Sequence, residues 1–535
     1  MKGARKYMDI KDETITLTIL ETSDIHGAIL PINYANNEEL DLGLAKIATL
    51  IKEEKQKNKN LILIDNGDLI QGTPLTYHYA RIDNSKINPV IKILNYLNYD
   101  LAVIGNHEFN YGIEILNRAI KESEFPWLSA NIIYKASNKC FTRQPYIVKS
   151  FDSGIKVGIL GLTTKYIPNW ESPTNIQGLS FEDPVEHAKK WVKILKDEEK
   201  VDIVVVSYHG GFERNIETGK PTENLTGENQ GYELCRDVPD IDILLTGHQH
   251  RSIYGCKING VLVLQPGNQG LILGKAEIVF KKTKDAIKVI DKRSELLSVD
   301  GIKVDAKVIQ MVNEYETKAQ AWLDKPIGKI EGNMVASDHM TMRTSDNALI
   351  EFINKVQMEY SGAAISNTAL FDNHSPGFPS DVTMRDIVSN YIYPNTLRVI
   401  RITGHDIKAA LERSAAYFEK YDGENIRVNP KFSNPKPQHY NYDMWEGIEY
   451  TIDISKPIGE RIGKLEIEGK LLDLDKEYDV VMNNYRAGGG GEYLMFQNKP
   501  VIKDIPTDVS ELIANYILER GTIQATVDGN WRVIY

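Results

Sequence analysis

The chain has 535 residues, of which 42% are hydrophobic and 26% charged, and its formal net charge is −11 at pH 7. This length predicts two or three domains, and the composition is that of an ordinary globular protein. The negative charge argues against a surface that coats a nucleic acid polymer. A small anionic substrate remains compatible with it, because a bound metal ion can invert the local field.

The three cysteines, Cys140, Cys235 and Cys256, are scattered and show no CxxC spacing. Neither a disulfide framework nor a thiolate zinc site is expected, and all three are predicted to be small buried side chains. Residues 1–12 are predicted to be a tail without the apolar segment of a secretory signal, and no run reaches membrane-spanning length. As the sequence stands we expect a cytoplasmic protein; the alternative is an exported, periplasmic or cell-wall protein whose signal has been removed.

Short apolar segments in the first half are each followed by side chains of the kind that bind metal ions. If these segments are buried strands, each carries the chain to a sheet edge, where the following loop holds the reactive groups. In chain order, residues 14–21 precede Asp24 and His26, 61–65 precede Asp68, 101–104 precede Asn106, 201–208 precede His209, and 241–246 precede His248 and His250.

Helical patterns separate these strands, and further β-rich segments accumulate towards residue 282. Stripes of apolar residues predict helices at 42–55, 89–97 and 184–196. This order predicts an N-terminal α/β/β/α sandwich, two mixed sheets flanked by helices, over residues 13–300.

A helical pattern with a charged surface follows at residues 305–323, and Asp324-Lys325-Pro326 closes it. We predict a linker helix within residues 301–335 and a separate α+β domain over residues 336–535. Within that domain, helices are expected at 347–360 and 405–418, and strands at 397–404, 447–454 and 478–485.

The strand-end side chains offer oxygen and imidazole ligands but no thiolate, which suits Mn²⁺, Fe²⁺, Zn²⁺ or Co²⁺. Seven ligands are too many for one tetrahedral ion and about right for two divalent metal ions, with Asp68 as the shared carboxylate. Two ions about 4 Å apart form a clamp for phosphoryl transfer, lowering the pKa of a bound water and neutralising phosphate oxygens. The predicted ligands are Asp24, His26, Asp68, Asn106, His209, His248 and His250.

The motifs SDIHG, DNGD, GNHEF, SYHGG and TGHQH resemble those of the calcineurin-like metallophosphoesterases, and among these the bacterial 5'-nucleotidase family, whose second domain binds the nucleoside. The resemblance covers nearly the whole chain. It implies one metal held by Asp24, His26, Asp68 and His250, and another held by Asp68, Asn106, His209 and His248. It also implies that the catalytic residues are Asn106, as a ligand, and His107, as transition-state stabiliser or general acid beside the phosphate. Glu108 is then expected to be a structural hydrogen-bonding residue.

The second half resembles most the family members that are 2',3'-cyclic-nucleotide 2'-phosphodiesterase/3'-nucleotidases, through the stretches YPNTL, LERSAAYF, YNYDMWEGIEYTIDISKP and NNYRAGGGGEY. In this family two aromatic rings sandwich the base, and the matching positions are Tyr442 and Tyr485. Stacking accepts any base, so broad base choice is expected. Gly488, Gly489 and Gly490 would let the backbone approach the sugar or base. The residues alone, without the resemblance, favour a core role for Tyr442 and a turn role for Tyr485.

Three departures from the 5'-nucleotidase branch fit the cyclic-phosphodiesterase branch and argue against direct hydrolysis of 5'-monophosphates. That branch has Asp three residues after the catalytic His, where this chain has Asn110. It also has Arg after a glycine-rich segment, where this chain has Ser366-Asn367-Thr368-Ala369-Leu370-Phe371, and some members carry an Asp in the glycine loop that is missing here. An amide cannot raise the basicity of His107 as a carboxylate would.

The leading hypothesis is a two-metal hydrolase that opens 2',3'-cyclic nucleotides to 3'-nucleotides and converts these to nucleoside and phosphate. One alternative is a 5'-nucleotidase or nucleotide-sugar hydrolase; another is a nucleotide-binding protein that lost turnover. The expected partner is a nucleotide, not a nucleic acid polymer or a membrane, and a monomer is favoured.

Overall fold

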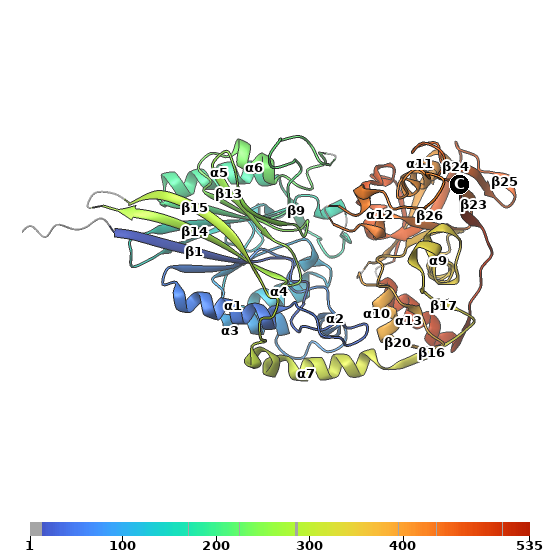
Figure 1. Cartoon of the computed structure of the whole chain (residues 1–535), viewed down its shortest axis with the longest axis horizontal. Helices are drawn as coiled ribbons and strands as arrows, with labels where there is room; N and C mark the ends of the chain where they lie inside the picture. Colours follow the sequence, from blue (N-terminus) through green and yellow to red (C-terminus); the bar gives the residue numbers. More distant parts are fainter. Residues whose placement is uncertain are drawn as a thin grey trace, which may run out of the picture. The chain divides into compact units, whose positions relative to one another are not determined.

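The structure is a computed structural model that describes residues 13–169, 171–223, 225–283, 287–393, 395–434, 436–505 and 507–535 (Figure 1). The predicted tail, residues 1–12, lies outside this description. The chain forms two compact units. The first comprises the described residues up to Ile32, Glu39–Ile167 and Ile176–Tyr315, and the second Asn33–Glu38, Pro168–Asn175 and Glu316–Tyr535.

Two six-stranded sheets form the centre of the first unit, with strand orders β15-β14-β1-β2-β3-β4 and β12-β13-β11-β10-β8-β7. The first sheet contains β1 (Glu13–Thr22), β2 (Leu61–Asp65), β3 (Leu101–Val103), β4 (Trp127–Leu128), β14 (Ile272–Lys282) and β15 (Ile287–Ser298). The second contains β7 (Tyr146–Ser150), β8 (Lys156–Thr163), β10 (Ile203–His209), β11 (Ile243–Thr246), β12 (Ser252–Ile258) and β13 (Val261–Pro266). A small third sheet joins β5 (Ile132–Tyr134), β6 (Lys139–Cys140) and β9 (Leu179–Phe181).

The strands that lead to the candidate ligands are central and parallel. β2 pairs in parallel with β1 and β3, and β10 pairs in parallel with β8 and β11. Their continuous apolar runs are buried, as expected for strands covered on both faces. One hydrophobic core fills the space between the sheets, with Ile19 and Ile64 contributed by one sheet and Val205 and Leu245 by the other.

Helices cover both outer faces of this sandwich. Figure 1 shows α1 and α3 on one side and α5 and α6 on the other. The helices of this unit are α1 (Leu44–Lys57), α2 (Pro74–Arg81), α3 (Pro89–Leu97), α4 (Ile113–Glu122), α5 (Pro184–Asp197) and α6 (Gly231–Asp237), with a 3-10 turn at His107–Phe109. α2, α4 and α6 were not predicted; α2 is short and depends on its Thr73 cap and on Pro74 in its first turn.

The second unit is built around a five-stranded sheet with strand order β22-β18-β26-β21-β27. These strands are β18 (Ile365–Ala369), β21 (Leu397–Thr403), β22 (Asp443–Glu446), β26 (Glu477–Asn483) and β27 (Val501–Ile505). A four-stranded sheet contains β23 (Glu449–Asp453), β24 (Ile462–Ile467), β25 (Lys470–Leu471) and β29 (Trp531–Ile534). Smaller sheets join β16 (Pro326–Glu331), β20 (Asp381–Thr383) and β28 (Thr522–Gln524), and β17 (Met334–Val335) with β19 (Gly377–Phe378).

The helices of the second unit are α8 (His339–Thr344), α9 (Ala348–Ser361), α10 (Met384–Asn390), α11 (Gly404–Ala415), α12 (Asn484–Ala487) and α13 (Val509–Arg520). α7 (Ala306–Leu323) begins in the first unit and ends in the second, and it falls within the predicted linker. The predicted fold class, an α/β/β/α sandwich followed by an α+β domain, is confirmed; the predicted domain bounds stay a prediction.

Two smaller expectations can be compared with the structure. Cys235 is buried, but Cys140 and Cys256 are half-buried, so the prediction of three buried cysteines is right for one. Among the described residues, no helix combines the length and the apolar character that a membrane crossing requires.

Candidate metal centre

The seven candidate ligands lie at the ends of five strands of the first unit, either in the loop that follows the strand or, for His209, at the strand's last residue. β1 leads to Asp24 and His26, β2 to Asp68, β3 to Asn106, β10 to His209, and β11 to His248 and His250. The first three strands belong to one sheet and the last two to the other. The ligands therefore gather where the carboxyl ends of both sheets meet.

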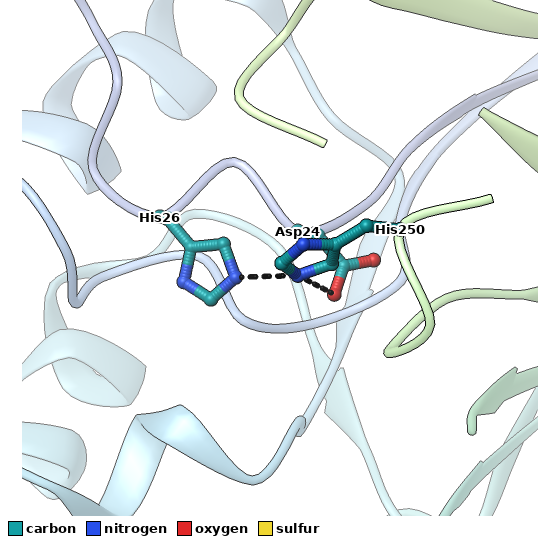
Figure 2. A group of neighbouring side chains, drawn as sticks. All are labelled: Asp24, His26 and His250. Atoms are coloured by element: carbon teal, nitrogen blue, oxygen red, sulfur yellow. Dashed lines mark hydrogen bonds and ion pairs between the residues drawn. The ribbon is translucent and has the colours of Figure 1, made fainter. Parts of the chain in front are cut away.

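Asp24, His26 and His250 form a first group, in which one ligand atom of each lies within 4.8 Å of the others. Figure 2 shows the three side chains pointing toward one another. The Nε2 atoms of His26 and His250 are 3.1 Å apart, and His250 Nε2 is 3.5 Å from Asp24 Oδ1. Two imidazole nitrogens beside a carboxylate oxygen suit one divalent transition-metal ion.

Asp68, His209 and His248 form a second group by the same distance limit. Asn106 joins it, because its Oδ1 atom lies 3.1 Å from His209 Nε2 and 2.9 Å from His248 Nδ1. An amide oxygen, a carboxylate and two imidazoles again suit a divalent ion.

Asp68 connects the two groups. Its Oδ2 atom lies 3.1 Å from His209 Nε2 and 4.0 Å from His26 Nε2. The other carboxylate oxygen, Oδ1, accepts a hydrogen bond from the backbone N–H of His107 at 2.7 Å, which fixes the carboxylate plane. Asp68 therefore lies within 4.0 Å of an imidazole from each ligand group.

The backbone of these loops is strained. Left-handed conformations are rare for residues other than glycine and cost about 1–3 kcal/mol each, and they cluster at functional sites. Five of the seven candidate ligands adopt them: Asp24 (φ 52°), His26 (φ 49°), Asp68 (φ 55°), His248 (φ 65°) and His250 (φ 55°).

Two glycines make room for the ligand carboxylates. A Cβ atom on Gly105 would lie 2.4 Å from Asp68 Oδ1, and one on Gly247 would lie 2.6 Å from Asp24 Oδ2. Contacts under 3 Å are not tolerated in a packed interior. Any side chain at these positions would displace a candidate ligand.

The Glu108 side chain binds the backbone of the loop that contains Asp68, which confirms the structural role expected for Glu108. Its side chain is completely buried, and its two oxygens accept four backbone N–H groups. Oε2 accepts from Gly105 and Asp68 at 2.7 and 2.8 Å, and Oε1 accepts from Leu69 and Ile70 at 2.6 and 3.3 Å. One carboxylate thus joins the loops after β2 and β3.

The ionisable side chains of this site strongly shift one another's pKa values. Burial, together with the charge of Asp68, raises the pKa of Asp24 to about 7, while burial lowers the pKa of His26 to about 4. Burial disfavours the charged forms of His209 and Asp68, but the attraction between their opposite charges outweighs this effect. The pKa of His209 therefore rises to about 10, and the pKa of Asp68 falls well below its usual value. The site therefore favours carboxylates compensated by positive charge, which divalent ions would supply.

His107 stands apart from both ligand groups. Its Nδ1 atom is 2.6 Å from Asn110 Oδ1, and its ring centre lies 5.2 Å from that of His26. Because an amide oxygen can only accept, Nδ1 carries a proton and Nε2 is left as the atom that exchanges one.

Sequence reasoning missed two residues that orient the imidazoles. The backbone carbonyl of Asn66 lies 2.7 Å from His209 Nδ1, and Glu228 Oε1 lies 3.1 Å from His248 Nε2. Partners of this kind fix the tautomer and ring angle of a ligating imidazole. Asn66 could have been suspected from its place beside Asp68, but no sequence signal marks Glu228.

In the second unit, the structure does not fit the predicted stacking role of Tyr442. Its side chain is completely buried among Tyr417 and Phe418, and its hydroxyl donates to the carbonyl of Arg343 at 2.7 Å. A ring with no exposed face cannot stack on a base. Two residues earlier in the same segment, Tyr440 has a half-buried ring.

Tyr485 is half-buried and lies next to Tyr440, with ring centres 6.4 Å apart and planes at 73°. A Cβ on Gly490 would lie 2.5 Å from the Tyr485 ring, so the glycine loop that contains Gly488, Gly489 and Gly490 packs directly on this tyrosine.

The buried Arg486, which was not predicted, holds these pieces together. It donates to the Tyr440 carbonyl at 2.7 Å and to the carbonyl of Gly490, and its Nε lies 2.7 Å from Asp443 Oδ2. One guanidinium therefore fixes the relative positions of the Tyr440 segment and the glycine loop.

Comparison with known proteins agrees with this architecture. Residues 17–252 match the calcineurin-like phosphoesterases, and residues 326–498 match the 5'-nucleotidase C-terminal domain. Calcineurin-like phosphoesterases use divalent metals, and the two ligand groups lie within the matched region.

Named relatives cover almost the whole chain. It is 27% identical, over 97% of its length, to the trifunctional nucleotide phosphoesterase protein YfkN of Bacillus subtilis, and it spans only 39% of that longer relative. It is 28% identical to the 2',3'-cyclic-nucleotide 2'-phosphodiesterase/3'-nucleotidase of Salmonella typhimurium, covering 97% of this chain and 89% of the relative.

The crystal structure of a putative 5'-nucleotidase from Staphylococcus aureus superposes with a TM-score of 0.87 at 34% identity, covering 97% of this chain and 99% of that one. Family members are metal-dependent phosphoesterases. Both domain matches, the relatives and the structural neighbour lead to one conclusion: the chain belongs to the 5'-nucleotidase family of calcineurin-like phosphoesterases.

Proposed function

We propose that this protein hydrolyses 2',3'-cyclic nucleotides to 3'-nucleotides and these to nucleoside and phosphate. The observation that carries the reaction class is the pair of ligand groups that share Asp68. The choice of substrate is supported by relatives named 2',3'-cyclic-nucleotide 2'-phosphodiesterase/3'-nucleotidase in Salmonella typhimurium and Yersinia enterocolitica.

Two divalent ions, Mn²⁺, Zn²⁺, Fe²⁺ or Co²⁺, would be held by the two ligand groups. Asp24, His26, His250 and the shared Asp68 would hold one, and Asp68, Asn106, His209 and His248 the other. When bound, such ions activate water and neutralise phosphate oxygens. The ligand loops contribute by keeping these donors in place before substrate arrives.

His107 supplies the proton in this proposal. Water attacks phosphorus in line with the leaving oxygen, the bond between phosphorus and the ribose 2'-oxygen breaks, and His107 Nε2 gives its proton to that oxygen. The proton lost by the attacking water passes through solvent and restores the proton on His107. Asn110 supports this role because its amide oxygen, 2.6 Å from Nδ1, orients the ring and keeps the exchangeable proton on Nε2. The same steps, repeated at the 3'-ester, release phosphate.

The second unit would bind the nucleoside. Tyr485, which packs against Gly490, and the neighbouring Tyr440 offer half-buried aromatic rings. Stacking contributes about 1–3 kcal/mol per base and does not depend on which base it is. The proposal therefore includes broad base specificity, with Tyr440 in place of Tyr442.

The test is phosphate release from 2',3'-cyclic AMP, 3'-AMP and 5'-AMP, measured side by side with Mn²⁺. We expect turnover of the first two. A coupled phosphatase reveals the 3'-nucleotide intermediate, and Asp68→Asn serves as the inactive control. Efficient hydrolysis of 5'-AMP without any hydrolysis of 3'-AMP would refute the substrate assignment while leaving the reaction class intact.

One observation favours a second candidate, a 5'-nucleotidase. The structural neighbour from Staphylococcus aureus, at 34% identity, is described as a putative 5'-nucleotidase. The same three-substrate assay separates the two activities. A third outcome, metal binding without turnover of any nucleotide, would indicate a nucleotide-binding protein.

A further inference from the structure

Four carboxylates form a second cluster, entirely within the second unit. One oxygen of each of Asp346, Glu351, Glu446 and Asp528 lies within 4.8 Å of the others. They come from three separate parts of the chain. Asp346 and Glu351 flank the start of α9, Glu446 ends β22, and Asp528 lies in the loop between β28 and β29.

Hydrogen-bond donors of the protein already compensate part of the negative charge of this cluster. Glu351 accepts hydrogen bonds from Lys355 Nζ, from the Thr526 hydroxyl and, at 2.7 Å, from the Asp528 N–H. Asp346 Oδ2 accepts from the Gly529 N–H at 2.8 Å. These contacts hold the loop against α9 and orient the carboxylates.

Glu446 is not compensated in this way. Only 3% of its surface is exposed, and its Oε1 atom accepts no hydrogen bond from any residue that the structure describes. Asp346 Oδ1 is also buried without a donor among those residues. A buried carboxylate oxygen without a donor costs free energy, because it has lost water and gained nothing in return.

The local charge is strongly negative. Lys355 provides one positive charge against four carboxylates. Its Nζ atom contacts one of these carboxylates, Glu351, and also donates to the Thr526 hydroxyl at 3.0 Å. Burial raises the pKa of Glu446 to about 8, and the charges of Asp528, Asp346 and Glu351 add to this rise. The cluster therefore lacks positive charge at the point where Glu446 Oε1 lies.

We propose that Asp346, Glu351, Glu446 and Asp528 form a cation site for Ca²⁺, at which Glu446 Oε1 and Asp346 Oδ1 are ligands. The donors are all carboxylate oxygens, which hard cations prefer over transition metals. Oxygens on opposite sides of one Ca²⁺ are about 4.6–5.2 Å apart, twice the metal–oxygen distance, and the cluster fits within this span. Mg²⁺ needs a tighter octahedral arrangement.

Such an ion would fasten the C-terminal segment to the core of the second unit. Asp528 lies three residues before Trp531, the first residue of β29. The Trp531 ring stacks on Tyr450 with ring centres 5.8 Å apart and planes at 9°. The Asp346 N–H donates to the Trp531 carbonyl at 3.3 Å. The ion's role is structural, so this inference goes beyond the proposed phosphoesterase activity and does not depend on it.

The test measures thermal unfolding of the full chain at a fixed, saturating Mn²⁺ concentration while Ca²⁺ is titrated up to about 10 mM, which covers the affinities of protein calcium sites. The wild type should show a saturable rise in Tm. Glu446→Gln should show none, and the exposed control Glu468→Gln should behave as the wild type. A wild-type Tm independent of Ca²⁺, or an equal rise in Glu446→Gln, would overturn the proposal.

A second measurement covers the case in which Glu446→Gln does not fold. Tb³⁺ replaces Ca²⁺ and emits when a nearby tryptophan is excited, and Trp445 is adjacent to Glu446 in the chain. We expect Tb³⁺ emission that Ca²⁺ displaces and that Asp528→Asn, a change in an exposed loop, reduces at least tenfold. Unchanged emission in Asp528→Asn would refute the site. A wild-type protein insensitive to Ca²⁺, together with a Glu446→Gln protein more stable than it, would show that Glu446 is simply protonated.

Discussion

Replacing Glu108 with Gln should loosen the metal centre without removing any candidate ligand. The two carboxylate oxygens accept from four backbone N–H groups, two each. Gln has one acceptor oxygen, so two N–H groups face an amide NH₂ whichever way the side chain is turned. Each buried donor left without a partner costs about 1–3 kcal/mol, which gives a loss of roughly 2–6 kcal/mol in the free energy of unfolding.

The change should also weaken metal binding, because Asp68 belongs to the loop that Glu108 holds. Removing a supporting partner of a metal ligand typically lowers affinity by about 10–100-fold. Urea unfolding measures the first effect, and phosphate release as a function of Mn²⁺ concentration measures the second. Glu124→Gln, on an exposed carboxylate, is the matched control. A destabilised Glu108→Gln protein with a wild-type Mn²⁺ titration would refute the idea that Glu108 supports the metal loop.

The remaining predictions concern other sites. His107→Ala should keep its metal content and lose about 10²–10⁴-fold in kcat, measured by metal analysis beside phosphate release; loss of metal would place His107 among the ligands. Asn110→Asp should move the alkaline limb of the pH profile to higher pH, because a carboxylate beside Nδ1 raises the pKa of the imidazole; an unmoved limb would exclude His107 as the acid. Tyr485→Ala should raise KM about 5–150-fold, whereas Tyr442→Ala should lower the free energy of unfolding by about 3–5 kcal/mol. Kinetics and urea unfolding measure the two effects. A raised KM in Tyr442→Ala and a loss of stability in Tyr485→Ala would make Tyr442 the stacking ring. In Ca²⁺-free buffer, the free energy of unfolding should fall as pH rises from about 5 to about 8, by at most about 1.4 kcal/mol per pH unit. The cause is that the folded chain retains on Glu446 a proton that the unfolded chain has released. If the same pH dependence persists in Glu446→Gln, another group causes it.

The first unit could be predicted well because its signals are local. A parallel strand covered on both faces needs a continuous apolar run, and the polar residues that follow must lie at the sheet edge. Asp24, Asp68 and His209 each follow such a run, so their proximity was predictable without knowledge of the strand order. α2, α4 and α6 were missed because short helices depend on caps and on packing more than on periodicity.

Contacts between distant segments could not be predicted. Glu228 reaches His248 from a loop without any pattern, and Glu446 meets Asp528 across 82 positions of the chain. Tyr440 lies in a 3-10 turn (His439–Asn441) and Tyr442 directly before β22, so the alternation of a strand cannot tell the half-buried ring from the buried one. Only the packing around Tyr417 distinguishes them.

The left-handed conformations of five candidate ligands have a consequence for metal exchange. Loops that folding has already fixed in shape do not have to become ordered when an ion arrives, so capture carries little entropic cost on the protein side. The uptake of an ion would then depend on how readily the ion sheds its water, and its release would not require unfolding. A preformed metal-binding site with carboxylate, amide and imidazole donors accepts several divalent ions of similar size. Which ion this enzyme carries would thus follow what its surroundings supply, and a change of surroundings could change the ion without a change in sequence.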